Sequence, residues 1–217
     1  MTKLTKIVIY KLKIMPRRFS NAEKAQIRDL LMEAGEKLFS AKGLRKVTVD
    51  DLARASGISK GAFYAFFPSK EDLMFEIMED SERLFRNEVA LFLTEESIPP
   101  RERVKVFFER YVRFINRYVL LKTITEEDMA VLKRKIAPER LQAHFEREDK
   151  MIMDWIKDWQ STGKMSDVDP QAVLGLFKAV LYMGLHVNEM GSEVFNKAMQ
   201  LFAKILSEQL VIDENIV

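Results

Sequence analysis

Apolar side chains recur at intervals of three and four residues along most of this chain, which is the spacing of an amphipathic α-helix. Only 8 Gly and 6 Pro occur among the 217 residues, so few positions interrupt this pattern. The pattern therefore predicts an all-α protein. The helical stripes lie in residues 21–42, 70–91, 104–118, 138–162, 170–187 and 192–206.

Capping residues mark where these helices begin. Ser20, followed three residues later by Glu23, is a capping box that predicts the start of the first helix. Thr48, Ser59 and Ser69 stand where a side-chain oxygen can accept a backbone N–H at the start of a further helix. Later starts are marked by Pro138, by Asp169 with Pro170, and by Ser192.

Two short predicted helices lie close together in residues 48–67 and are separated by a turn that contains Gly57. Glycine adopts the positive φ angle that a sharp turn requires. Ala53 is small enough to let the second helix approach, and Phe63 closes the core beneath it. Two helices joined in this way form a helix-turn-helix, a motif that binds DNA.

The second of these helices presents side chains suited to DNA on its outer face. Lys60 supplies a mobile cation, while Gly61 and Ala62 leave room for the backbone to approach base edges. Tyr64 combines an apolar ring with a hydroxyl group that can bind a phosphate oxygen. The N-termini of both short helices add oriented N–H groups, which favour anions.

The charge of the chain is unevenly distributed, although its net value is only +2. Residues 1–70 contain 15 Lys and Arg against 6 Asp and Glu, a net charge of +9. Residues 71–217 contain the remaining 20 basic residues against 27 acidic ones, a net charge of −7. This asymmetry favours a basic head that binds a polyanion, although solvated helix faces would give a similar composition.

The region around the predicted motif resembles the DNA-binding domain of the TetR (tetracycline-repressor-like) family of transcriptional regulators. The resemblance covers residues 24–84 and rests on two segments, GISKGAFY at 57–64 and FPSKEDL at 67–73. Phe39 and Gly43 match the family pattern upstream of these segments. The rest of the chain is similar to the family only in length and helical content.

The resemblance implies a set of DNA contacts that are carried over position by position. Phe66 departs from the pattern, because the family often has Tyr or another polar aromatic there, and we assign it to packing. The predicted DNA-binding residues are Thr48, Tyr64 and Lys70 for the phosphate backbone, Lys60, Gly61 and Ala62 for the bases, and Ser59 at the helix N-terminus.

We divide the chain into a basic N-terminal arm at 1–19, a helix-turn-helix domain at 20–70 and a helical body at 71–217. Basic arms can enter a neighbouring minor groove, although a frayed basic tail has the same composition. The capping box follows so directly that Met15 is an alternative start of the native chain.

The body is rich in Phe, Met, Trp and Tyr, which an ordinary helical core also requires. Helical bundles can hold ligands between their helices, and the resemblance implies such a pocket here. Methionine adapts to irregular shapes, so the composition favours a broad and largely apolar ligand. The candidate lining residues are Phe107, Phe108, Tyr111, Phe114, Met151, Trp155, Trp159 and Tyr182.

The last two predicted helices carry apolar stripes and small residues that permit close helix approach. Two such helices from each subunit can form a four-helix bundle around a two-fold axis. The same stripes can instead face the core of their own chain. The candidate dimer residues are Val173, Leu176, Val180, Met183 and Val187, with Phe195, Met199, Phe202, Ile205 and Leu206.

Several other classes of function are disfavoured. The absence of cysteine excludes disulfides and thiolate zinc sites, and the two histidines, His144 and His186, form no recognisable catalytic or metal-binding arrangement. We therefore expect no enzyme, no cofactor and no metal. No apolar run reaches the length of about 18 residues that indicates a membrane span, so we expect a cytoplasmic protein.

These observations predict a repressor that binds a near-palindromic double-stranded DNA operator as a homodimer and is released by a small, largely apolar ligand. Two alternatives stay open at this point. One is an activator of the same fold. The other is a helical ligand-binding or adaptor dimer whose DNA-binding head is vestigial.

Overall fold

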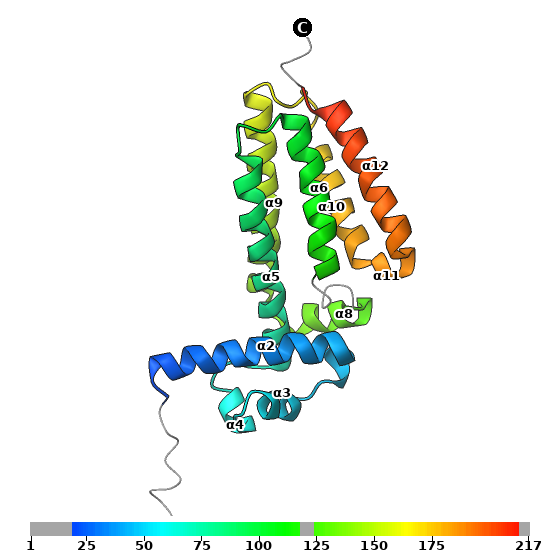
Figure 1. Ribbon diagram of the computed structural model, residues 1–217. Coiled ribbons are helices and arrows are strands. Elements are labelled where there is room, and N and C mark those ends of the chain that lie inside the picture. Colours follow the sequence, from blue (N-terminus) through cyan, green and yellow to red (C-terminus); the bar gives the residue numbers. More distant parts are fainter. Residues whose placement is uncertain (1–18, 118–123, 213–217) are drawn as a thin grey trace, which may run out of the picture.

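The computed structural model describes residues 19–117 and 124–212, and every named element in these residues is a helix (Figure 1). The prediction of an all-α fold is confirmed. In chain order the helices are α2 (Asn21–Lys46), α3 (Val49–Ala55), α4 (Lys60–Phe63), α5 (Lys70–Leu93), α6 (Pro100–Arg117), α8 (Glu126–Lys135), α9 (Pro138–Ser161), α10 (Pro170–Leu185), α11 (Val187–Met190) and α12 (Ser192–Leu210).

Side-chain caps start several helices where the sequence places them. Ser20 Oγ accepts the backbone N–H of Glu23 at 3.2 Å, and Ser69 caps α5 in the same way at 3.0 Å. The start of α12 differs from the prediction. Gly191, with a φ of 81°, occupies the capping position there, so Ser192 is the first helical residue and not the cap.

The helices form two groups that meet at α2 (Figure 1). The short helices α3 and α4 lie on one side of α2, and α5, α6, α9, α10 and α12 form a bundle on its other side. α8 lies at the end of the bundle nearest α2, and Thr125 caps it through the N–H of Asp128 at 3.1 Å. A small helix-turn-helix unit is thus followed by a larger helical body.

α2 and α5 cross closely at Gly35. A Cβ atom at this position would lie 2.7 Å from Cδ1 of Ile77 and 3.1 Å from Cδ2 of Leu73. Because glycine has no side chain, the two helices can touch at this joint. α5 also packs on α6, so one continuous helix links the small unit to the body.

Aromatic rings fill the interior of the body between α5, α6, α9 and α10. The rings of Phe85 and Phe114 stack with centroids 4.5 Å apart, and those of Trp155 and Trp159 lie 4.7 Å apart. Phe177 of α10 meets the Trp155 ring edge-on at 5.4 Å. These contacts form a packed aromatic core.

Most residues that were predicted to line a ligand pocket belong to this core. Burial of Tyr111 raises the pKa of its hydroxyl group, because the phenolate would lose its hydration. Met151 is half-buried on α9. Tyr182 is 62% exposed, so its predicted place inside a pocket is wrong. The other members of the set, all buried or half-buried, are Phe107, Phe108, Phe114, Trp155 and Trp159.

The predicted dimer stripes on α10 and α12 are only partly accessible. Leu176 and Ile205 are exposed, and Met183 and Phe202 are half-buried. The remaining six residues pack into the core of their own chain, where a second subunit cannot reach them. This part of the prediction is wrong for Val173, Val180, Val187, Phe195, Met199 and Leu206.

Candidate nucleic-acid interface

α3 begins with a capping box at Thr48. Thr48 Oγ1 accepts the backbone N–H of Asp51 at 3.1 Å, and the Asp51 carboxylate accepts the backbone N–H of Thr48 at 3.1 Å. These hydrogen bonds hold the pKa of Asp51 below its ordinary value, because they favour the charged carboxylate. Thr48 remains exposed at a helix N-terminus, a suitable place for a phosphate.

The turn after α3 and the cap of α4 follow the sequence pattern closely. Gly57 has a φ of 70°, and Ser59 Oγ accepts the backbone N–H of Ala62 at 3.1 Å. α4 ends at Phe63, four residues before the end of the span 48–67 that was predicted for the two short helices. The chain leaves α4 through a tight turn of residues 64–66.

The two faces of α4 differ in burial. Phe63 is fully buried beneath α4, whereas Lys60 and Gly61 are exposed and Tyr64 is 52% exposed. Ala62 is half-buried. A Cβ atom at Gly61 would meet no atom closer than Ser59 Oγ at 4.0 Å, so the space in front of this glycine is open. The outer face therefore offers a cation, a ring with a hydroxyl group and room for close approach.

Asp50 is a residue of this surface that the sequence analysis missed. Its carboxylate accepts a hydrogen bond from Lys60 Nζ at 2.7 Å, which links the first turns of α3 and α4. The sequence signal was weak, because an acidic residue in the first turn of a helix is ordinarily explained by the helix dipole.

Lys70 makes contacts within the protein that the sequence did not predict. Its ammonium group donates to the carbonyl oxygens of Leu44 and Val47, both at 2.7 Å, at the C-terminal end of α2. A third, longer contact of 3.5 Å reaches the carbonyl of Arg45. Two of its three N–H donors thus satisfy carbonyl groups at the end of α2, and the phosphate contact implied by the family resemblance stays a prediction.

Arg28 connects α2, α5 and the segment that follows α4, and the sequence analysis also missed it. Its guanidinium group donates to both carboxylate oxygens of Glu76 at 2.5 Å. The same group lies over the Phe67 ring at 4.6 Å and contacts the Phe66 carbonyl at 3.5 Å. Phe66 is half-buried and meets the Phe19 ring at 6.0 Å, which agrees with its assignment to packing.

Most of the predicted basic arm, residues 1–18, lies outside the described residues. In residues 19–117 and 124–212, no helix is long and apolar enough to cross a membrane. No group of His, Asp and Glu side chains in the same residues is arranged to hold a metal ion.

Comparison with known proteins shows what this chain is similar to. Residues 31–77 match the family model for bacterial regulatory proteins of the tetR family. The regulator YuxN of Bacillus subtilis is 45% identical over 49 residues, a match that covers 23% of this chain and 17% of that protein. The repressor DhaR of Mycobacterium sp. strain GP1 is 24% identical over 139 residues, which covers 64% of this chain and 70% of DhaR.

A solved TetR-family regulator from Pectobacterium atrosepticum has the same fold, with a TM-score of 0.69 and 18% identity. The superposition covers 90% of this chain and all of that one. The fold and the surface on α3 and α4 define a helix-turn-helix DNA-binding protein. The chain carries the DNA-binding domain of the TetR family of bacterial transcriptional regulators, which the family model matches over residues 31–77. Regulators of this family bind DNA and are not enzymes, as the sequence analysis expected.

Proposed function

We propose that this protein is a transcriptional repressor that binds a near-palindromic operator as a homodimer. The observation that carries the proposal is the outer face of α3 and α4, where Lys60, Gly61 and Tyr64 are exposed above a closed core. In the proposed complex α4 enters the major groove. Lys60, Gly61 and Ala62 face base edges, and Thr48, Ser59 and Tyr64 bind the phosphate backbone.

We assign DNA binding to residues 20–70, and dimerisation and ligand binding to residues 71–217, which are the boundaries predicted from the sequence. Residues 1–19 are proposed as a basic arm that adds phosphate or minor-groove contacts. A regulator of this kind works in the cytoplasm, where the bacterial chromosome lies. The exposed cation and tyrosine on α4 argue against a vestigial DNA-binding head.

The dimer interface is proposed on the outer faces of α10 and α12. Large apolar side chains are exposed there, including Tyr182 at 62%, Val194 and Leu201 at 57%, and Ile205 at 47%. Leu176 is a further exposed apolar residue of α10. A patch of this kind on a regulator that reads a two-fold site is suited to an isologous contact.

Release by a ligand is proposed to act through α5. This helix starts beside the helix-turn-helix, where Lys70 binds the end of α2, and runs into the body, where Phe85 packs among the rings of α6. A ligand that binds more tightly to one tilt of α5 changes the separation of the two α4 helices in the dimer.

The direct test is fluorescence anisotropy with DNA from around the protein's own coding region, compared with scrambled DNA of equal length at two salt concentrations. A preference of at least about 10³-fold for the native sequence is expected, since specific binders exceed their nonspecific affinity by this factor or more. Equal and steeply salt-dependent binding to both DNAs, across all flanking segments, would contradict the proposal.

A further inference from the structure

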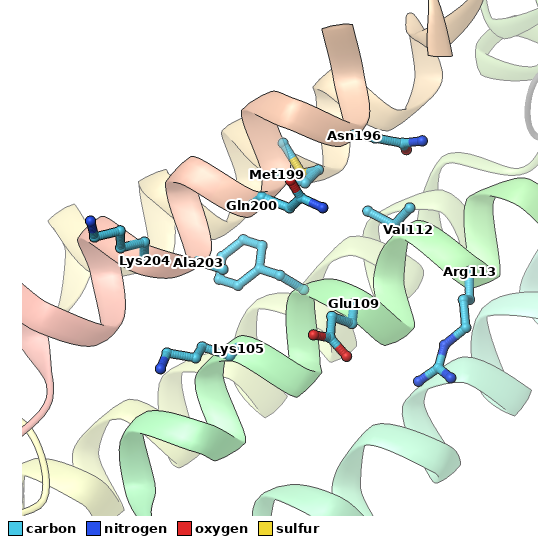
Figure 2. A pocket seen from close by; sticks show the side chains of 10 residues that line it. Lys105, Glu109, Val112, Arg113, Asn196, Met199, Gln200, Ala203 and Lys204 are labelled. Atoms are coloured by element: carbon cyan, nitrogen blue, oxygen red, sulfur yellow. The ribbon is translucent and has the colours of Figure 1, made fainter. Parts of the chain in front are cut away.

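A groove between α6 and α12 lies outside the ligand site that the sequence predicted, apart from one shared residue, Phe108. Its volume is about 430 Å³, which falls within the range of about 300–1,000 Å³ typical of small-molecule sites. One wall comes from α6 and the other from α12 (Figure 2). The groove is therefore large enough for a small ligand.

The floor of the groove is apolar. Phe108 and Met199 are each 1% exposed and Ala203 is 6% exposed, so these three side chains form a closed surface beneath the opening. Val112 extends the apolar surface along α6 (Figure 2). A hydrocarbon chain or flat ring placed on this surface would lose water on one side and gain dispersion contacts.

Positive charge flanks one end of the groove. Lys105 of α6 and Lys204 of α12 lie on opposite walls at this end (Figure 2), and both side chains are exposed. Lys105 has one distant ion partner, Glu102, at 3.9 Å. Within the described residues, Lys204 makes no ion pair or hydrogen bond through its side chain. Both ammonium groups therefore keep donors for an anion.

The charges along the α6 wall alternate in sign. Glu109 lies beyond Lys105, and Arg113 lies at the end of the groove opposite the two lysines. Only at the lysine end do cations from both walls flank the apolar floor, so the anionic group of a ligand is placed there and its apolar remainder on Phe108, Met199 and Ala203.

We propose that this groove is the effector site and that the effector is an elongated amphipathic anion. The proposal rests on the proposed function of ligand-controlled DNA binding. The anionic group, a carboxylate or phosphate, lies between Lys105 and Lys204, and the apolar part covers Phe108, Met199 and Ala203.

The groove has a route to the DNA-binding unit. α6, which forms one wall, packs on α5 through Phe107 and Phe114 against Phe85, and through an ion pair of Arg110 with Glu88 at 2.9 Å. A ligand that wedges α6 away from α12 shifts these contacts, and α5 carries the shift to the helix-turn-helix.

The proposed dimer contact leaves the floor of the groove accessible. On α12 the exposed residues Leu201 and Ile205 project from the side opposite Met199 and Ala203, because successive residues are rotated by about 100° around a helix. Lys204, three positions after Leu201, lies between the two surfaces, at the edge of the groove.

The test uses three probes that share an eight-carbon tail: octanoate, octan-1-ol and octyltrimethylammonium. Isothermal titration calorimetry on the full chain is expected to show saturable binding of octanoate, with one site per chain. Octan-1-ol should bind roughly tenfold more weakly or worse, because it lacks the charge-assisted hydrogen bonds, and the cation should not bind. Equal affinity for octan-1-ol, or no binding of octanoate up to about 10 mM, overturns the proposal.

Two variants locate the site. Replacement of both groove lysines, Lys105→Gln with Lys204→Gln, should weaken octanoate binding roughly tenfold or more. The matched control, Lys150→Gln with Lys157→Gln on the exposed face of α9, removes the same charge and should bind octanoate normally. Unchanged affinity in the groove variant, or an equal loss in the control, overturns the proposal.

A site-specific readout is the methyl resonance of Met199, identified by its absence in Met199→Leu. Octanoate should shift this resonance, whereas a shift confined to Met151 or Met153 would place the ligand near α9 and overturn the groove assignment. Anisotropy on the same samples separates the two proposals. Lysine-dependent octanoate binding without sequence-specific DNA binding refutes the proposed function alone, and specific DNA binding without octanoate binding refutes the groove alone.

Discussion

Lys60 Nζ lies 2.7 Å from Asp50 Oδ2, and this ion pair joins the first turns of α3 and α4 on the proposed DNA-binding surface. Both side chains are 55% exposed. The hydrogen bond and the charge of Asp50 raise the pKa of Lys60, so the ammonium group stays protonated. The carboxylate offsets the attraction of Lys60 for phosphates, while the ammonium keeps two N–H donors for base acceptors.

The first prediction concerns Asp50→Asn. Without the carboxylate, Lys60 should attract any phosphate backbone, so nonspecific affinity rises and the ratio of specific to nonspecific binding falls. The slope of log K against log salt concentration should steepen by about one unit. Anisotropy over a salt series measures both effects. The control is Asp167→Asn, which removes the same charge on the body, far from this surface, and should change neither the nonspecific affinity nor the salt slope. A shallower slope in Asp50→Asn would refute the role assigned to Asp50.

The second prediction concerns Gly61→Leu. The space around this glycine is open in the free protein, so the melting temperature should stay within about 2 °C of the parent. The added side chain should block approach to the bases and reduce specific binding at least roughly tenfold. Circular dichroism and anisotropy on the same sample separate the two effects. A large fall in melting temperature would show that this position faces inward.

The third prediction concerns Lys70→Met, which keeps the length of the side chain but removes the donors to Leu44 and Val47. The free energy of unfolding should fall by about 2 kcal/mol, because hydrogen bonds from a charged group are lost at a helix end. Urea denaturation measures this change. No loss of stability would contradict this role, and a reduction of the salt slope of DNA binding by about one unit would show that Lys70 also makes the predicted phosphate contact.

The fourth prediction tests the close crossing of α2 and α5. Gly35→Ala places a Cβ atom against Ile77, and the free energy of unfolding should fall by about 1 kcal/mol. Ile77→Val removes the Cδ1 atom that the new methyl group meets. In a double-mutant cycle the two changes should couple favourably by at least about 0.5 kcal/mol. Additive effects would show that the helices adjust without strain.

The fifth prediction concerns pH. Burial lowers the pKa of His144, because the charged imidazolium would lose its hydration. The carboxylate of Glu79 opposes this shift, whereas the positive charges of Arg147, Arg86 and Arg140 add to it. The carboxylate of Glu82 lies 3.3 Å from Nε2 of His144. The unfolded state therefore binds a proton more readily below about pH 6.5. Stability should fall as the pH drops through this range, by at most about 1.4 kcal/mol per pH unit from this group.

Denaturation with urea at pH 7.5 and pH 5.5 measures this dependence. His144→Gln should flatten it, because the titrating group is removed. His186→Gln is the matched control, since the other histidine of the chain is less buried, and it should leave the dependence intact. An unchanged pH dependence in His144→Gln would show that other groups, and not His144, control stability in this range.

Much of the local structure could be predicted from short-range sequence signals. Ser20, Thr48, Ser59 and Ser69 cap helices where their spacing indicated, since a cap involves residues only two or three positions apart. Gly57 adopts positive φ for the same local reason. The start of α12 shows the limit of such signals, because Ser192 was the predicted cap and Gly191 occupies the capping position.

The contacts between distant segments could not be predicted in this way. Arg28 and Glu76 are far apart in the sequence, and nothing in either neighbourhood shows that they form an ion pair. Lys70 matched a family position for a phosphate contact, yet the packing of α5 against α2 directs it to Leu44 and Val47. The apolar stripes of α10 and α12 gave no means to distinguish a core-facing residue from a surface-facing one.

The class of fold, most helix starts and the helix-turn-helix follow from the amino-acid sequence alone, because they depend on periodicity, on capping and on the backbone freedom of glycine within a few residues. Which apolar residues are buried, which charges meet and where an open groove remains became clear only from the packed structure. Those outcomes depend on how helices pack across long sequence separations. Val173 and Leu176, three positions apart on one stripe, illustrate the difference, since packing buries the first and leaves the second exposed.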